Sequence, residues 1–68
     1  MNLPSSFSEF VRNRVEAFAA QAVEYADCAR ECLSAARGSY GIAQRVHLRS
    51  ARHYGKMARM CRAAATAA

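Results

Sequence analysis

One short segment interrupts a chain that otherwise has helical periodicity throughout. The segment is GSYG at 38–41, and two glycines three residues apart can supply the positive φ values of a helix C-cap and turn. Near the start, Ser6 and Glu9 have the S-x-x-E spacing of a capping box. The sequence therefore predicts a helix over about 6–37, a turn over 38–41 and a second helix over about 42–65.

A heptad seam runs along the first predicted helix. Apolar residues follow one another there at alternating steps of four and three, the pattern of a helix that packs along one side. Ala19, Ala26 and Leu33 repeat every seven residues beside this seam and widen it to the stripe of a bundle helix. The seam residues are Val11, Val15, Phe18, Ala22, Tyr25, Ala29, Cys32 and Ala36.

The second predicted helix has a similar wide stripe. Gly55 lies in the middle of that helix, where glycine costs about 1 kcal/mol relative to alanine. We expect another backbone to approach closely there; a locally weak helix is the alternative. The stripe comprises Ala43, Val46, Ser50, Ala51, Tyr54, Met57, Ala58, Cys61 and Ala65.

Two long amphipathic helices joined by a short turn form an all-α antiparallel hairpin. Folding at 39–40 pairs positions that sum to about 79, which sets Cys32 against His47 and Cys61 against Phe18. A chain of 68 residues is too short for one secure core, so we expect two hairpins to pair as a homodimeric four-helix bundle. The first-helix seam, together with Tyr54, Ala58 and Cys61, is predicted to supply the core and dimer contacts.

The whole chain has a net charge of +5, and its positive charge is concentrated in the second half. The cations recur at steps of four and three on one side of the second helix. We call this set the basic row: Arg45, Arg49, Arg52, Lys56, Arg59 and Arg62. Such a row can bind a carboxylate-rich protein or track phosphates. It can also be a solvated face, partly balanced by an acidic stripe of Glu24, Asp27 and Glu31 on the first helix.

Tyr40 lies at the tip of the predicted hairpin. It is either an exposed anchor for a partner or folds back over Leu33, Ala36 or Ala43. We expect no exposed aromatics between the cations of the row, and the sequence has no nucleic-acid-binding motif, which favours a protein partner. The predicted partner-binding residues are Tyr40, Arg45, Arg49, Arg52, Lys56 and Arg59. In architecture the hairpin dimer is similar to the Rop family of plasmid-copy-number regulators, which implies the alternative of a dimer that binds nucleic acid through the basic row.

Other classes of function have little support in the residues. There is no glycine-rich phosphate loop and no nucleophile with an assembled base, so no enzyme is predicted. Cys28 and Cys32 resemble one C-x-x-x-C pair of a copper-storage bundle, but the register puts Cys61 about 15 Å from Cys28, so we predict no metal or cofactor. An odd number of cysteines, no signal-peptide pattern and no long apolar run predict a cytoplasmic protein.

The combination of about seventy residues, a capped first helix, the G-S-Y-G turn, a basic second helix and an Ala/Arg-rich composition resembles the small quorum-sensing anti-activators encoded by Pseudomonas phages. That resemblance implies a dimeric helical hairpin in the cytoplasm of a bacterial host. It also implies a non-enzymatic inhibitor that binds the DNA-binding domain of a LuxR-type transcriptional activator, with a pilus-assembly ATPase as a second target. The cationic row argues against a DNA mimic, because a mimic displays carboxylates.

Overall fold

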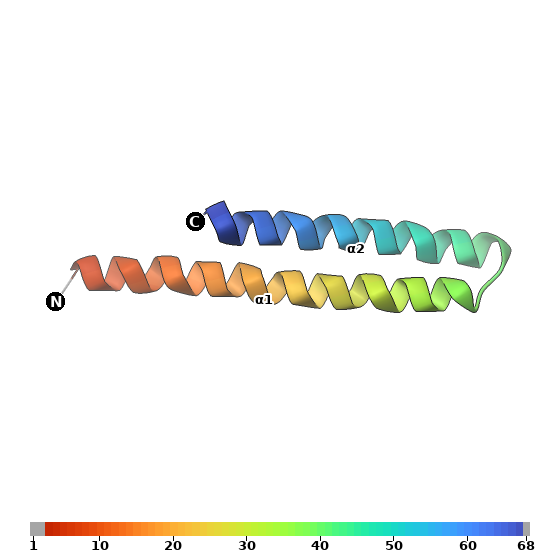
Figure 1. Ribbon diagram of the computed structural model, residues 1–68, viewed down its shortest axis with the longest axis horizontal. Coiled ribbons are helices and arrows are strands. Elements are labelled where there is room, and N and C mark those ends of the chain that lie inside the picture. Colours follow the sequence, from red (N-terminus) through yellow and green to blue (C-terminus); the bar gives the residue numbers. More distant parts are fainter. Residues whose placement is uncertain (1–2, 68) are drawn as a thin grey trace.

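The protein is an antiparallel hairpin of two long helices (Figure 1). The computed structural model describes residues 3–67, and side chains from Phe7 onward. Helix α1 spans Leu3–Arg37 and helix α2 spans Gly41–Ala67, and the described residues contain no strand. The two helices pack against each other in a rod of 60 × 15 × 12 Å, so the predicted all-α hairpin is confirmed.

The two helix ends farthest from the turn differ from the prediction. Helix α1 begins at Leu3, so Ser6 lies within the helix and the predicted start at a capping box is wrong. Pro4 does not prevent the earlier start, because a proline in the first helical turn lacks only an N–H that has no partner there. Helix α2 continues to Ala67, beyond the predicted end, through an alanine-rich segment with the highest helix propensity.

The turn is closed by short-range hydrogen bonds at the end of α1. The Gly38 amide donates to the carbonyl of Ala35 and the Ser39 amide to that of Ala36, both over 3.2 Å. These i to i−3 bonds satisfy carbonyls that the end of a helix leaves without partners. Gly41 has a φ of +62°, whereas Gly38 does not have a positive φ. The prediction that both glycines supply positive φ is therefore correct only for Gly41.

An aromatic contact fixes how the two helices are aligned. The rings of Tyr25 and Tyr54 stack with centroids 6.1 Å apart and planes 26° apart. Their residue numbers sum to 79, so the predicted register is confirmed. A step of seven residues along both helices gives the neighbouring levels, which are Cys32 with His47 and Phe18 with Cys61.

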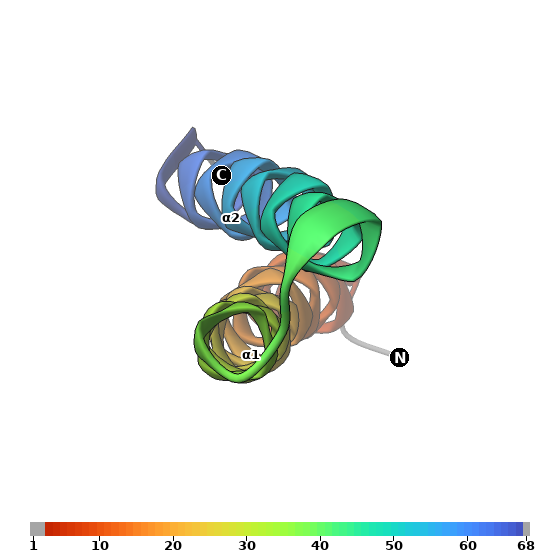
Figure 2. The same ribbon diagram turned by 90° about the vertical axis from the view of Figure 1, so that its right-hand side faces the viewer.

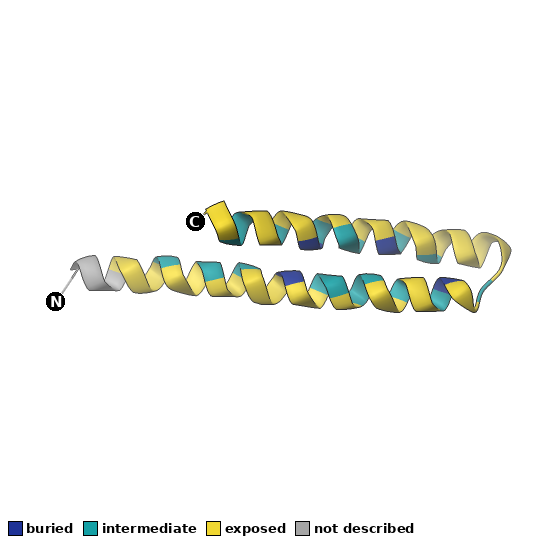
Figure 3. Cartoon of the chain, in the orientation of Figure 1, coloured by how far each residue is buried: buried dark blue, intermediate teal, exposed yellow. Residues whose placement is uncertain are grey.

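The core between the helices is thin and made of alanine. Among the described side chains four are buried, namely Ala22, Ala36, Ala51 and Ala58, and the buried positions lie where the helices face each other (Figure 3). Larger side chains of the predicted seam, including Tyr25, are half-buried on the same facing surfaces. Small side chains at the contact let the two helix axes come close together.

The predicted stripe of α2 is wrong at its first turns. Ala43 and Val46 are exposed, whereas His47 is half-buried. His47 lies in the same seven-residue row as Tyr54 and Cys61, which faces α1. Val46 precedes it by one residue and so lies about 100° away around the helix. The inner face of α2 therefore includes a polar residue that a search for apolar residues passes over.

We expect the Ala58→Leu variant to be less stable by about 1–3 kcal/mol, because Ala58 is 2% exposed and a larger side chain would push the helices apart. Urea denaturation followed by circular dichroism measures the change. The matched control is Ala63→Leu, at an exposed alanine of the same helix. Equal destabilisation of the two variants would contradict the close alanine packing.

Candidate functional site at the turn end and along the basic row

Two large apolar side chains project from the turn. Tyr40 is 88% exposed and Ile42 is 78% exposed, and we call this pair the apolar tip. This exposure rules out the alternative in which the Tyr40 ring folds back over the end of the hairpin, and the role of Tyr40 as an anchor for a partner stays a prediction. Ile42 was not among the predicted site residues. The signal that could have identified it is its position directly after Gly41 and outside the inner face of α2, which the buried Ala51 and Ala58 mark.

Two side chains hold the turn that carries the apolar tip. The Ser39 hydroxyl donates to the carbonyl of Ala35 over 2.8 Å, and the Gln44 side-chain amide donates to the carbonyl of Ala36 over 3.1 Å. The Gln44 bond links the first turn of α2 to the last turn of α1. The backbone of the tip is therefore fixed at both ends, which lowers the entropy lost when a partner binds.

The basic row lies on the surface of α2 over its whole length, because all six of its residues are exposed. Near the turn, Arg45, Arg49 and Arg52 surround Leu48 in a shallow hollow. Guanidinium groups arranged around an apolar floor can bind carboxylates while their stems contact apolar surface. The structure therefore brings together three predicted site residues near the turn, and places Lys56 and Arg59 further along the helix.

The cations of the basic row have no acidic partner within the described residues. The ion pair found there joins Arg30 to Asp27 within α1. The acidic stripe is exposed, and Glu24 lies about 200° around α1 from the buried Ala22. The expected partial balance between stripe and row is therefore not made by ion pairs. The row keeps its positive potential for an anionic partner.

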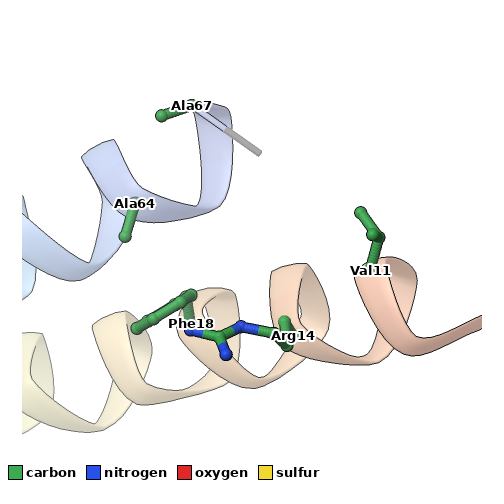
Figure 4. Close-up of a pocket in the computed structure, with 5 residues that line it drawn as sticks. All are labelled: Val11, Arg14, Phe18, Ala64 and Ala67. Carbon is green, nitrogen blue, oxygen red and sulfur yellow. The ribbon is translucent and has the colours of Figure 1, made fainter. Parts of the chain in front are cut away.

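The open end of the hairpin has a second apolar hollow, shown in Figure 4. Helix α1 extends beyond the end of α2 there (Figure 1). The hollow is lined by Val11, Arg14, Phe18, Ala64 and Ala67. The Arg14 guanidinium lies 5.7 Å from the centroids of both the Phe10 and the Phe18 rings. Phe7 and Phe10 remain exposed, so a single hairpin does not cover them.

The cysteines and histidines form no cluster at either end. Cys28, Cys32 and Cys61 are free and half-buried, and no three His, Cys, Asp or Glu residues in the described part of the chain gather as metal ligands would. Within residues 3–67 no helix has the length and apolar character needed to cross a membrane. Comparison with protein-family models, curated proteins and solved structures finds no match to this chain. Function is therefore inferred from the apolar tip and the basic row.

We expect Gln44→Ala to lower the stability of the hairpin by about 0.5–1.5 kcal/mol, because it removes the hydrogen bond to Ala36. Thermal unfolding measures the loss, and amide hydrogen exchange of Ser39 reports whether the turn opens more often. The control is Gln21→Ala, at an exposed glutamine of α1. Unchanged exchange at Ser39 would show that Gln44 does not hold the turn.

Proposed function

We propose that the protein is a small non-enzymatic regulator that acts as a homodimer and inhibits another protein by binding it through the turn end. The observation that carries the proposal is the exposure of Tyr40, 88%, on a hydrogen-bonded turn beside unpaired arginines. An exposed Tyr offers a large contact area for little conformational entropy, and Tyr and Arg are the residue types enriched at binding hot spots.

The chemistry of the site describes its partner. Ile42 and Tyr40 suit an apolar depression, and Arg45, Arg49 and Arg52 suit carboxylates around that depression. The resemblance to phage quorum-sensing anti-activators supports a LuxR-type DNA-binding domain as the first partner to test and a pilus-assembly ATPase as the second. Binding would block such a protein by occupying its surface, because the site offers no groups for chemistry.

The surface area of the hairpin supports the homodimer. The chain exposes 5410 Å², whereas a compact monomer of 7.5 kDa is expected to expose about 4,200 Å². The excess exceeds the roughly 800 Å² that each partner buries in a protein interface of standard size. Figure 2 shows the two helices without a third element on either side. A second copy would bury part of this excess.

A nucleic-acid-binding dimer is the second candidate, and the exposed, unpaired basic row is the observation that favours it. The row is about 25 Å long by helix rise, enough to follow several phosphates. Binding of this kind releases counterions, so its affinity falls steeply with salt. An apolar tip contributes little to such a complex, which is why the protein-binding function ranks first.

The test is a pull-down of the tagged full chain from bacterial lysate, with and without nuclease, followed by mass spectrometry. Tyr40→Ala and Arg49→Glu are expected to reduce recovery of one specific protein at least about tenfold, the effect of removing a hot-spot residue, while helix content and dimerisation stay unchanged. Phe10→Ala and Arg12→Glu, at an exposed aromatic and an exposed arginine of α1, are the matched controls.

Each outcome separates the two candidates. Recovery that survives nuclease and is lost in the Tyr40 and Arg49 variants supports the protein-binding function and names the target. Recovery that disappears with nuclease and decreases steeply with salt supports the nucleic-acid-binding function. Equal loss of recovery in the control variants would show that the turn end is not the binding site.

A further inference from the structure

One side of the hairpin has an uncovered groove between α1 and α2. Two hollows form it, one containing Val23 and one containing Leu33, Leu48 and Gly55. Arginines of the basic row also line it, Arg62 in the first hollow and Arg52 and Arg59 in the second. Val23 is 59% exposed, and Leu33 and Leu48 are also exposed. We call this side the groove face. Val46 lies outside it, because two residues of separation place Val46 about 200° around α2 from Leu48.

The charges along the α1 edge of the groove face reverse sign about Val23. A row at seven-residue spacing consists of Glu9, Glu16, Val23, Arg30 and Arg37. Residues at this spacing stay on nearly the same side of a helix. If a second α1 lies antiparallel with Val23 against Val23, then Glu16 faces Arg30 of the second copy and Glu9 faces Arg37. The row is therefore complementary to itself under a two-fold rotation.

Gly55 lies at the same level of the hairpin as Val23. The stacked pair of Tyr25 and Tyr54 fixes this level, since Val23 is two residues from Tyr25 and Gly55 is one residue from Tyr54. A Cβ added to Gly55 would meet only the Arg59 side chain, at 3.8 Å. Packing within the hairpin therefore does not require glycine here. The expected close approach of another backbone is not made within the hairpin, and the surface of Gly55 is left for a second copy.

We propose that two copies of the chain associate through their groove faces, about a two-fold axis that passes between the two Val23 side chains and between the two Gly55 residues. Helix α1 then lies antiparallel to α1 of the second copy, and helix α2 lies antiparallel to α2 of the second copy. Two features on different helices place the axis at the same level, and the exposed surface is large enough to supply the interface. This inference rests on the proposed homodimer, but not on the identity of any partner.

The arrangement distributes charge unevenly over the dimer. Along the α1 pair, Glu and Arg of different copies alternate and attract each other. Along the α2 pair, the two basic rows lie next to each other and repel. Approach of the two Gly55 backbones requires the Arg59 side chains, which lie against Gly55 in the single hairpin, to turn outward. The repelling rows would then form one strongly positive face.

Disulfide trapping tests the position of the axis. In a full-length chain with the three native cysteines replaced by alanine, Val23→Cys is expected to form a disulfide-linked dimer under mild oxidation. A residue on a two-fold axis comes within the roughly 7 Å Cα separation that a disulfide needs. The control is Val46→Cys, at a valine of similar exposure, 53%, outside the groove face. It is expected to remain unlinked.

The outcomes separate this inference from the homodimer itself. Sedimentation that shows only a monomer at all concentrations would overturn both. A dimer that cross-links through Val46→Cys but not through Val23→Cys would overturn the groove face and leave the homodimer in place. Neither result depends on recovery of a partner in the pull-down, so failure of the partner-binding function is seen separately.

Charge exchange tests the antiparallel pairing without altering the cysteines. Glu16→Arg is expected to weaken the dimer about tenfold, because two attractive pairs become repulsive. Adding Arg30→Glu to that variant is expected to restore the wild-type dissociation constant, measured by sedimentation. Glu24→Arg, on the outer side of α1, is the control and should leave the constant nearly unchanged. A double variant that dimerises no better than Glu16→Arg alone would overturn the pairing.

Discussion

Close contact between alanines of α1 and α2 is the constraint on which the rest of the structure depends. Among the residues whose burial is described, the four that are buried are alanines. Alanine at these positions lets two long helices lie close enough for Tyr25 and Tyr54 to stack. Burying a methyl group stabilises far less than burying a leucine side chain. The hairpin therefore gains little from its core, and large apolar residues such as Val23 and Leu33 remain exposed. A second copy of the chain would cover these exposed apolar side chains.

Periodicity made the fold and its register predictable. Heptad spacing defined the face of α1, and folding the chain at the GSYG turn gave the sum of 79 that Tyr25 and Tyr54 satisfy. The errors on α2 have a common cause. Residues were assigned to the inner face because they are apolar, whereas the angular position around the helix determines which residues face α1. Val46 is apolar but lies off the inner face, whereas His47 is polar and lies on it. Ile42 and Gln44 were missed because their positions depend on the conformation of the turn, which spacing does not determine.

The charges are separated rather than paired. An ion pair between α1 and α2 would have held the hairpin together, yet the pair recorded among the described residues lies within α1. Exposed pairs add about 1 kcal/mol or less, so the hairpin loses little stability by leaving the basic row unpaired. Arginines without acidic partners keep their full attraction for an anionic surface.

In the proposed two-fold dimer, the two copies of the apolar tip are far apart, whereas the two basic rows are adjacent. The tip and the row would therefore bind partners in different ways. An antiparallel dimer places its two turns at opposite ends of the bundle, so each Tyr40 would act separately and one dimer would bind two partner molecules. The same axis places the two basic rows side by side, so a polyanion would cover both rows at once and one dimer would bind one such molecule. Partner binding at the tip itself needs only one intact hairpin, whereas polyanion binding depends on the dimer. Leu48 and Arg52 belong both to the hollow near the turn and to the groove face, so the dimer leaves the apolar tip, Arg45 and Arg49 for a partner. The two α2 helices would meet at Gly55. A change at Gly55 would therefore affect polyanion binding directly, and binding of a partner at the apolar tip only indirectly.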